Sequence, residues 1–187
     1  VRVACLVPIF GFLLSRGRCA SCGCEISPAY PLMEALYGLL ACLFVFKYGL
    51  NSISACYYLA SATAISIAVV DVKSMKIPNT LLLVFLAFSL YPAVSDFRVL
   101  DNLYGLLIMA GFFIVILLLL PGSFGAGDVK LASAIGVIAG GGMAVIVLET
   151  ALVSGAIIGV AYAMYRKTGL RIKMPFAPFL AFGLVVA

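Results

Sequence analysis

The chain has 187 residues, of which 65% are hydrophobic and only 10% are charged, and its formal net charge is +5. Soluble domains carry about 25% charged residues, so this composition excludes an ordinary water-soluble domain and indicates a membrane protein. The positive charge does not call for a nucleic-acid partner, because basic loops at one face of a lipid bilayer account for it.

The N-terminal segment, residues 1–30, is too short and too interrupted to cross a bilayer. Its apolar part, Val1 to Leu14, contains Pro8 and Gly11 and is flanked by arginines, which favours an interfacial position. We therefore expect a cytoplasmic or interfacial segment here that also carries three closely spaced cysteines. Residues 31–187 are expected to form a separate domain of spanning helices.

Seven apolar stretches follow, and about 20 apolar residues, or fewer where neighbours shield the ends, are enough to cross a bilayer. The stretches are Pro31–Phe46, Ile53–Val70, Thr80–Ala93, Asn102–Leu120, Val129–Leu148, Thr150–Tyr165 and Pro175 to the end. The expected fold class is therefore all-α, a polytopic membrane helix bundle of about seven spans. Two glycine pairs have the spacing that lets membrane helices pack closely, Gly136 with Gly140 and Gly155 with Gly159.

The basic residues of this bundle fall mostly on one side. Alternating the loops across the membrane collects on that side Arg16, Arg18, Lys73, Lys76, Lys130, Arg166, Lys167, Arg171 and Lys173. The opposite side receives only Lys47 and Arg98. Short cytoplasmic loops retain lysine and arginine, so we expect the first side to face the cytoplasm.

Solvation explains four of the seven acidic residues, including Glu149 at an expected outer helix end, and a helix N-terminus explains Glu34. Two others remain. Asp71 ends one apolar span and Asp128 opens a later one, and the alternation of loops places both at the cytoplasmic edge. A charged aspartate in a spanning helix costs roughly 2.5–3.5 kcal/mol to insert, so such residues are candidates for function. On position alone, a helix cap or an ion pair with a nearby lysine explains them equally well.

The chemistry available to the chain favours a catalytic pair. Two carboxylates held close together share one proton, so the ionised one takes a proton from water while the protonated one polarises a peptide carbonyl. Histidine is absent from the sequence and the cysteines lie elsewhere, so acid-base work would fall to aspartate, glutamate, lysine or tyrosine. Gly125 and Gly127 precede Asp128, and glycine permits both special backbone conformations and the close approach of a peptide substrate.

The order of several motifs resembles that of the type IV prepilin peptidases. The motifs are Asp71 with Ile77-Pro78-Asn79, then Gly125-Ala126-Gly127-Asp128-Val129-Lys130-Leu131, and finally Met174-Pro175-Phe176-Ala177-Pro178-Phe179. Upstream, residues 18–22 and 26–34 are similar to the cysteine segment of that family and to its junction with the next helix. The resemblance covers nearly the whole chain.

The resemblance implies a membrane-embedded GxGD aspartic protease of the bacterial inner membrane. It makes Asp71 and Asp128 the catalytic pair, with no cofactor for proteolysis, and we expect Gly125, Gly127 and Lys130 to contact the substrate. The implied substrates are prepilins and pseudopilins, cut on the cytoplasmic side between a short basic leader and a hydrophobic helix. Many members also methylate the new N-terminus, so S-adenosylmethionine is an expected cofactor only if methyl transfer is retained.

The cysteine segment departs from the fuller family pattern, which has an extra N-terminal span and two Cys-x-x-Cys pairs. This chain has one pair, Cys19 and Cys22, with Cys24 two residues later. We expect these cysteines on the reducing side of the membrane, where structural disulfides are rare, and their spacing suits thiolate ligation of zinc. A zinc site needs about four ligands, so Cys5 is a candidate for the fourth, and the metal would organise the loop.

An alternative interpretation is a small ion- or proton-coupled transporter, with Asp71 and Asp128 as ion sites at broken helices. The composition fits it, but the chain shows no paired halves and both carboxylates lie at one edge of the bilayer instead of its midplane. A structural subunit of a secretion assembly is a third interpretation, and it would not require both aspartates. The oligomeric state does not follow from the sequence.

Overall fold

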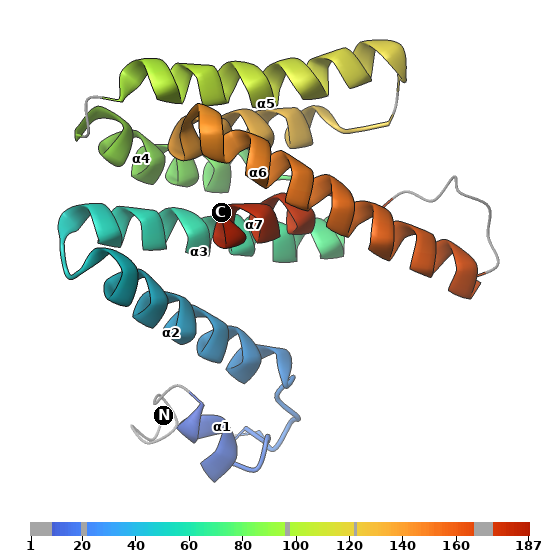
Figure 1. Ribbon diagram of the computed structural model, residues 1–187. Coiled ribbons are helices and arrows are strands. Elements are labelled where there is room, and N and C mark those ends of the chain that lie inside the picture. Colours follow the sequence, from blue (N-terminus) through green and yellow to red (C-terminus); the bar gives the residue numbers. More distant parts are fainter. Residues whose placement is uncertain (1–8, 20–21, 96–97, 122, 167–173) are drawn as a thin grey trace. The chain divides into compact units, whose positions relative to one another are not determined.

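The computed structural model describes residues 9–19, 22–95, 98–121, 123–166 and 174–187, and these contain seven helices and no named strand (Figure 1). The helices are α1 (Phe10–Leu14), α2 (Ala29–Tyr48), α3 (Ser52–Ser74), α4 (Asn79–Ser95), α5 (Val99–Leu119), α6 (Ala126–Arg166) and α7 (Ala177–Val186). The chain divides into two compact units, Val1–Ser54 and Ala55–Ala187.

Helices suited to a membrane make up most of this fold. In the described part of the chain, α2, α3, α5 and α6 are long and apolar enough to cross a bilayer, and α4 and α7 are apolar but shorter. Large apolar side chains point outward, as with Leu118 and Leu119 of α5, which are 75% and 74% exposed. Lipid solvates such side chains where water would not. The expected all-α, multi-pass membrane fold is therefore confirmed.

The N-terminal unit combines the cysteine segment with α2. Arg18 and Glu25 form an isolated antiparallel bridge that closes the turn containing the cysteines. The N–H of Ile9 donates to the carboxylate of Glu34 in α2, at 2.7 Å. The compact unit runs to Ser54 and includes the whole of α2, whereas the functional boundary expected at residue 30 stays a prediction.

Helix α6 is two helices joined at Gly140, where the chain reverses its direction (Figure 1). Gly140 has φ +73° and ψ 174°, a combination that is open essentially to glycine alone. The predicted boundary between the fifth and sixth spans, at residues 148–150, is therefore wrong. Glu149 suggested the end of a helix there, but it lies exposed within the second part of α6.

Close contacts between small residues hold the second unit together. Gly105 of α5 and Gly136 of α6 face each other, and a Cβ on either one would overlap the carbonyl oxygen of the other. A Cβ on Gly183 of α7 would lie only 2.6 Å from the carbonyl oxygen of Val147 in α6. Small residues allow membrane helices to gain packing contacts where lipid offers no hydrophobic drive. The packing role predicted for Gly136 is confirmed, whereas Gly140 forms the reversal.

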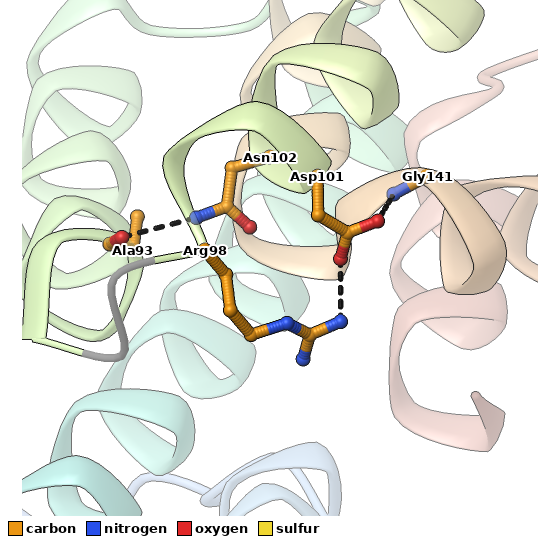
Figure 2. A network of polar contacts seen from close by, with 5 residues as sticks. All are labelled: Ala93, Arg98, Asp101, Asn102 and Gly141. Atoms are coloured by element: carbon orange, nitrogen blue, oxygen red, sulfur yellow. Dashed lines mark hydrogen bonds and ion pairs between the residues drawn. The ribbon is translucent and has the colours of Figure 1, made fainter.

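A polar network fixes the end of the second unit where α6 reverses (Figure 2). Asp101, in the first turn of α5, accepts a hydrogen bond from the N–H of Gly141 at 3.0 Å and pairs with Arg98. Asn102 donates from its side chain to the carbonyl oxygen of Ala93 at 3.1 Å, near the end of α4. That oxygen has no partner within its own helix, because the last four carbonyls of a helix are unpaired. The network therefore joins α4, α5 and the reversal.

Candidate active site

Asp71 lies near the end of α3 and is buried, with only 5% of its surface exposed. Its Oδ2 accepts a hydrogen bond from the N–H of Ala177 at 3.2 Å. Ala177 is the first residue of α7, so this N–H has no acceptor within its own helix. The positive end of the α7 dipole also favours a carboxylate at this place. The start of α7 therefore fixes the direction of one oxygen of Asp71.

The turn after Asp71 ends α3 sharply. Met75 has φ +51°, in the left-handed region, and its N–H donates to the carbonyl oxygen of Asp71 at 2.7 Å. Pro78 follows three residues later and restricts Ile77 to a non-helical backbone, so a new helix begins only at Asn79. The turn thus holds the Ile-Pro-Asn motif at a fixed place relative to Asp71.

Asp128 is the third residue of α6, and it helps to begin that helix. Its Oδ2 accepts a hydrogen bond from the N–H of Gly125 at 3.0 Å. The carbonyl oxygen of Gly125 in turn accepts from the N–H groups of Asp128 and Val129, at 3.0 and 3.4 Å. A carboxylate that bonds back to the N-cap amide satisfies a group the helix would leave unpaired. Asp128 is therefore a cap as well as a candidate for catalysis.

The segments that carry Asp71 and Asp128 meet although they belong to α3 and α6. Ile77, in the turn after Asp71, packs against Gly127, the residue next to Asp128. Among the described residues the neighbouring lysines form no ion pair with either aspartate. Each carboxylate is instead held by a backbone N–H, which leaves the lysine-pair explanation without support.

A cluster of phenylalanines connects the two segments that hold the aspartates. Phe124 precedes the amide that bonds to Asp128, and Phe176 precedes the amide that bonds to Asp71. Their rings pack edge to face with centroids 4.9 Å apart, and Phe113 of α5 contacts both, at 5.0 and 5.7 Å. Edge-to-face pairs contribute about 0.5–1.5 kcal/mol beyond their buried area. The cluster therefore ties the two segments together.

Room for Phe176 comes from the second part of α6. A Cβ on Gly155 would lie 3.3 Å from the Phe176 ring, and one on Gly159 would lie 3.8 Å from the sulfur of Met174. Both glycines thus face the segment that leads into α7. The pair therefore makes room for side chains of that segment, and the close approach of helix backbones predicted from its spacing stays a prediction.

Gly127 and Gly125 differ in what surrounds them. A Cβ on Gly127 would lie 3.2 Å from Cβ of Ile77 and 3.4 Å from its Cγ1 and Cδ1. Gly125 is exposed, and a Cβ there would meet Asp128 at an ordinary 3.4 Å. Neither glycine has a positive φ, so the expectation of a glycine-only backbone conformation is wrong. At position 127 glycine is explained by the space that Ile77 occupies.

Lys130 is exposed in the first turns of α6, two residues after Asp128. Lys73 and Lys76 are likewise exposed, in the turn that follows Asp71. These three lysines therefore belong to the same end of the second unit as the two carboxylates. The role of Lys130 in binding substrate stays a prediction.

The three cysteines converge in the N-terminal unit. The sulfur atoms of Cys19, Cys22 and Cys24 lie within 4.8 Å of one another. Cys22 and Cys24 form a disulfide, where the sequence led us to expect reduced thiols. A tight turn brings neighbouring sulfurs together whether they bind a metal or each other. Zinc requires thiolates, so the predicted zinc site requires reduction of this pair and stays a prediction. Cys5 lies outside the described residues.

Comparisons with known proteins cover most of the chain. A family model described as the Type IV leader peptidase family matches residues 58–160, and one described as the Bacterial Peptidase A24 N-terminal domain matches residues 1–48. No solved structure gives a significant match.

The curated relatives are named prepilin leader peptidase/N-methyltransferase. The protein of that name from Bacillus subtilis (strain 168) is 34% identical, over 97% of this chain and 74% of its own length. Those from Stutzerimonas stutzeri and Dichelobacter nodosus are 28% and 32% identical, each over 94% of this chain. The chain spans only 63% and 62% of the length of these last two relatives.

Proposed function

The chain belongs to the type IV leader peptidase family, and we propose from this that it is a membrane-embedded aspartic endopeptidase that removes the leaders of prepilins or pseudopilins. One observation carries the aspartic mechanism. Two carboxylates from separate helices are each held by a backbone N–H, and the segments that carry them pack against one another through Ile77 and Gly127 and through Phe124 and Phe176. The family assignment also replaces the alternative of an ion-coupled transporter.

In the proposed reaction the two carboxyl groups share one proton. The ionised one takes a proton from water, the water oxygen bonds to the peptide carbonyl carbon, and the protonated one donates to the carbonyl oxygen. The tetrahedral intermediate then collapses as the carbon–nitrogen bond breaks and a proton passes to the leaving nitrogen. No cofactor is required for this hydrolysis.

We place the active site at the cytoplasmic face of the bacterial inner membrane. The exposed lysines near the site, Lys73, Lys76 and Lys130, support this orientation, because cytoplasmic loops retain basic residues. Lys167, Arg171 and Lys173, which the same argument assigned to that face, lie outside the described residues. A substrate whose hydrophobic helix stays in the bilayer would present its scissile bond at this edge.

Methyl transfer is a second candidate activity. The relatives' names include N-methyltransferase, and the N-terminal family model matches residues 1–48. S-adenosylmethionine would be the methyl donor. Incubation of the cleaved product with the chain and this donor, followed by mass spectrometry of the new N-terminus, would show whether the activity is present.

The test of the proposed protease is cleavage of a prepilin by the chain reconstituted in liposomes. Asp71→Asn and Asp128→Asn should each lower the rate by about 10³-fold or more, because an amide cannot exchange the proton that the carboxyl pair shares. Glu149→Gln, the same change at an exposed position in α6, should cleave as the unchanged chain does. A variant at either aspartate that still cleaves at a normal rate would remove that residue from the pair.

A further inference from the structure

We propose that Ile77 is a positioning residue that sets the separation of the two catalytic carboxylates through its contact with Gly127. This inference rests on the proposed peptidase function. It starts from the places of the two residues in the chain. Ile77 follows Asp71 after one tight turn, and Gly127 is directly joined to Asp128.

The contact leaves little room for a side chain at position 127. Three atoms of Ile77, its Cβ, Cγ1 and Cδ1, lie 3.2 to 3.4 Å from the point where a Cβ of residue 127 would stand. The 3.2 Å contact with Cβ is tighter than most carbon contacts in proteins, so an added methyl would move the two segments apart by a few tenths of an ångström. Ile77 itself is partly buried and packs against the hydrophobic core of the second unit, which limits how far it can yield.

Both segments are held firmly on their own side of the contact. On one side, the N–H of Met75 bonds to the carbonyl of Asp71 at 2.7 Å, and the following proline restricts the backbone of Ile77. On the other side, the reciprocal bonds between Gly125 and Asp128 fix the start of α6. A displacement at the contact therefore passes to the carboxylates. Since misplacement by about 1 Å can cost 10²-fold in rate, a shift of a few tenths of an ångström should cost several-fold.

The two glycines of the motif would then have different roles. The side-chain space of Gly127 is occupied by the chain's own Ile77, so a substrate does not use it. Gly125 is exposed next to Asp128 and remains the place where a peptide backbone approaches closely. In this inference Gly127 fixes the positions of the two aspartates relative to one another. This role takes the place of the predicted role in binding substrate.

The test is a double-mutant cycle on prepilin cleavage by the reconstituted chain. Gly127→Ala should lower kcat roughly 3- to 10-fold with little change in KM, because the carboxylates move slightly while the substrate site remains. Adding Ile77→Gly removes all three atoms, including the closest one, Cβ, so the double variant should recover at least about twofold in kcat over Gly127→Ala. Leu81→Gly, the same kind of truncation nearby in α4, should give no such recovery.

Each outcome supports or overturns the inference. A double variant no more active than Gly127→Ala would overturn it, and so would a rise in KM at unchanged kcat for Gly127→Ala, which would place Gly127 against the substrate. If Gly127→Ala does not fold, the double variant must restore folded protein by circular dichroism for the inference to stand. Suppose that both aspartate variants lose cleavage but the double variant is no more active than Gly127→Ala. The proposed protease function then stands, and only the role of Ile77 is refuted.

Discussion

Asp71 depends on a main-chain group that no sequence motif reveals. Every residue except proline carries an N–H, so nothing in the letters of residues 174–179 shows that Ala177 is the donor. The aspartates could be singled out as candidates from the sequence, because a charged carboxylate in an apolar segment costs free energy to insert into a membrane. The reason for a glycine at position 127 could not be predicted, since it lies in a contact with Ile77 that only the folded chain creates.

Replacing Ala177 with proline should remove the hydrogen bond to Asp71, and it should also displace Phe176, because a residue before proline avoids the helical backbone region that Phe176 occupies (φ −98°, ψ −22°). A hydrogen bond to a charged group contributes about 1.5–3 kcal/mol, so kcat for prepilin cleavage should fall about 10- to 100-fold. Steady-state kinetics on the reconstituted variant would measure this.

Ala177 is fully buried, so added bulk needs a control of its own. Ala177→Val is at least as large as proline but keeps the N–H, and it should retain clearly more activity than Ala177→Pro. Equal losses in the two variants would assign the effect to crowding and leave the hydrogen bond without a role.

At the scale of elements, long apolar runs predicted most helices to within a few residues. The expected span Ile53–Val70 corresponds to α3, and Asn102–Leu120 corresponds to α5. The reversal in α6 escaped prediction, because hydrophobic residues continue on both sides of Gly140 and a charged residue further on imitates a helix end. The backbone conformation of Gly140 sets the position of the reversal, and hydropathy carries no information about backbone conformation.

Gly140→Ala should lower the free energy of unfolding of the chain. Its φ of +73° strains any residue with a Cβ, at a cost of about 1–3 kcal/mol, and the new methyl would also collide with the carboxylate of Asp101. Thermal unfolding in detergent, followed by circular dichroism, would show a lower midpoint. Gly142→Ala is the matched control, because a Cβ there meets nothing within 4 Å. Equal midpoints for the two variants would contradict a special role for Gly140.

At the scale of the molecule, the second unit has two polar ends of different character. One carries the aspartates with Lys73 and Lys130, and the other carries the network of Asp101 and Arg98. The distribution of basic residues predicted which end faces the cytoplasm. The direction of insertion is a separate property that labelling measures directly.

Cysteine labelling would test that direction in a variant whose six native cysteines are replaced by serine. Ser95→Cys, exposed at the end of α4, should react with a membrane-impermeant maleimide added to intact spheroplasts. Ser74→Cys and Ser123→Cys, exposed beside the two aspartates, should react only after permeabilisation. The reverse pattern would place the active site on the outer face.

The reversal in α6 also bears on how water reaches the active site. The 14 residues from Ala126 to Ala139 rise only about 21 Å at 1.5 Å per residue, whereas the hydrocarbon layer is about 30 Å thick. Thinning of the bilayer is one way in which so short a segment is accommodated. Bulk water would then reach Asp128. A peptide bond at the edge of the apolar helix bundle could be hydrolysed without a dedicated water channel.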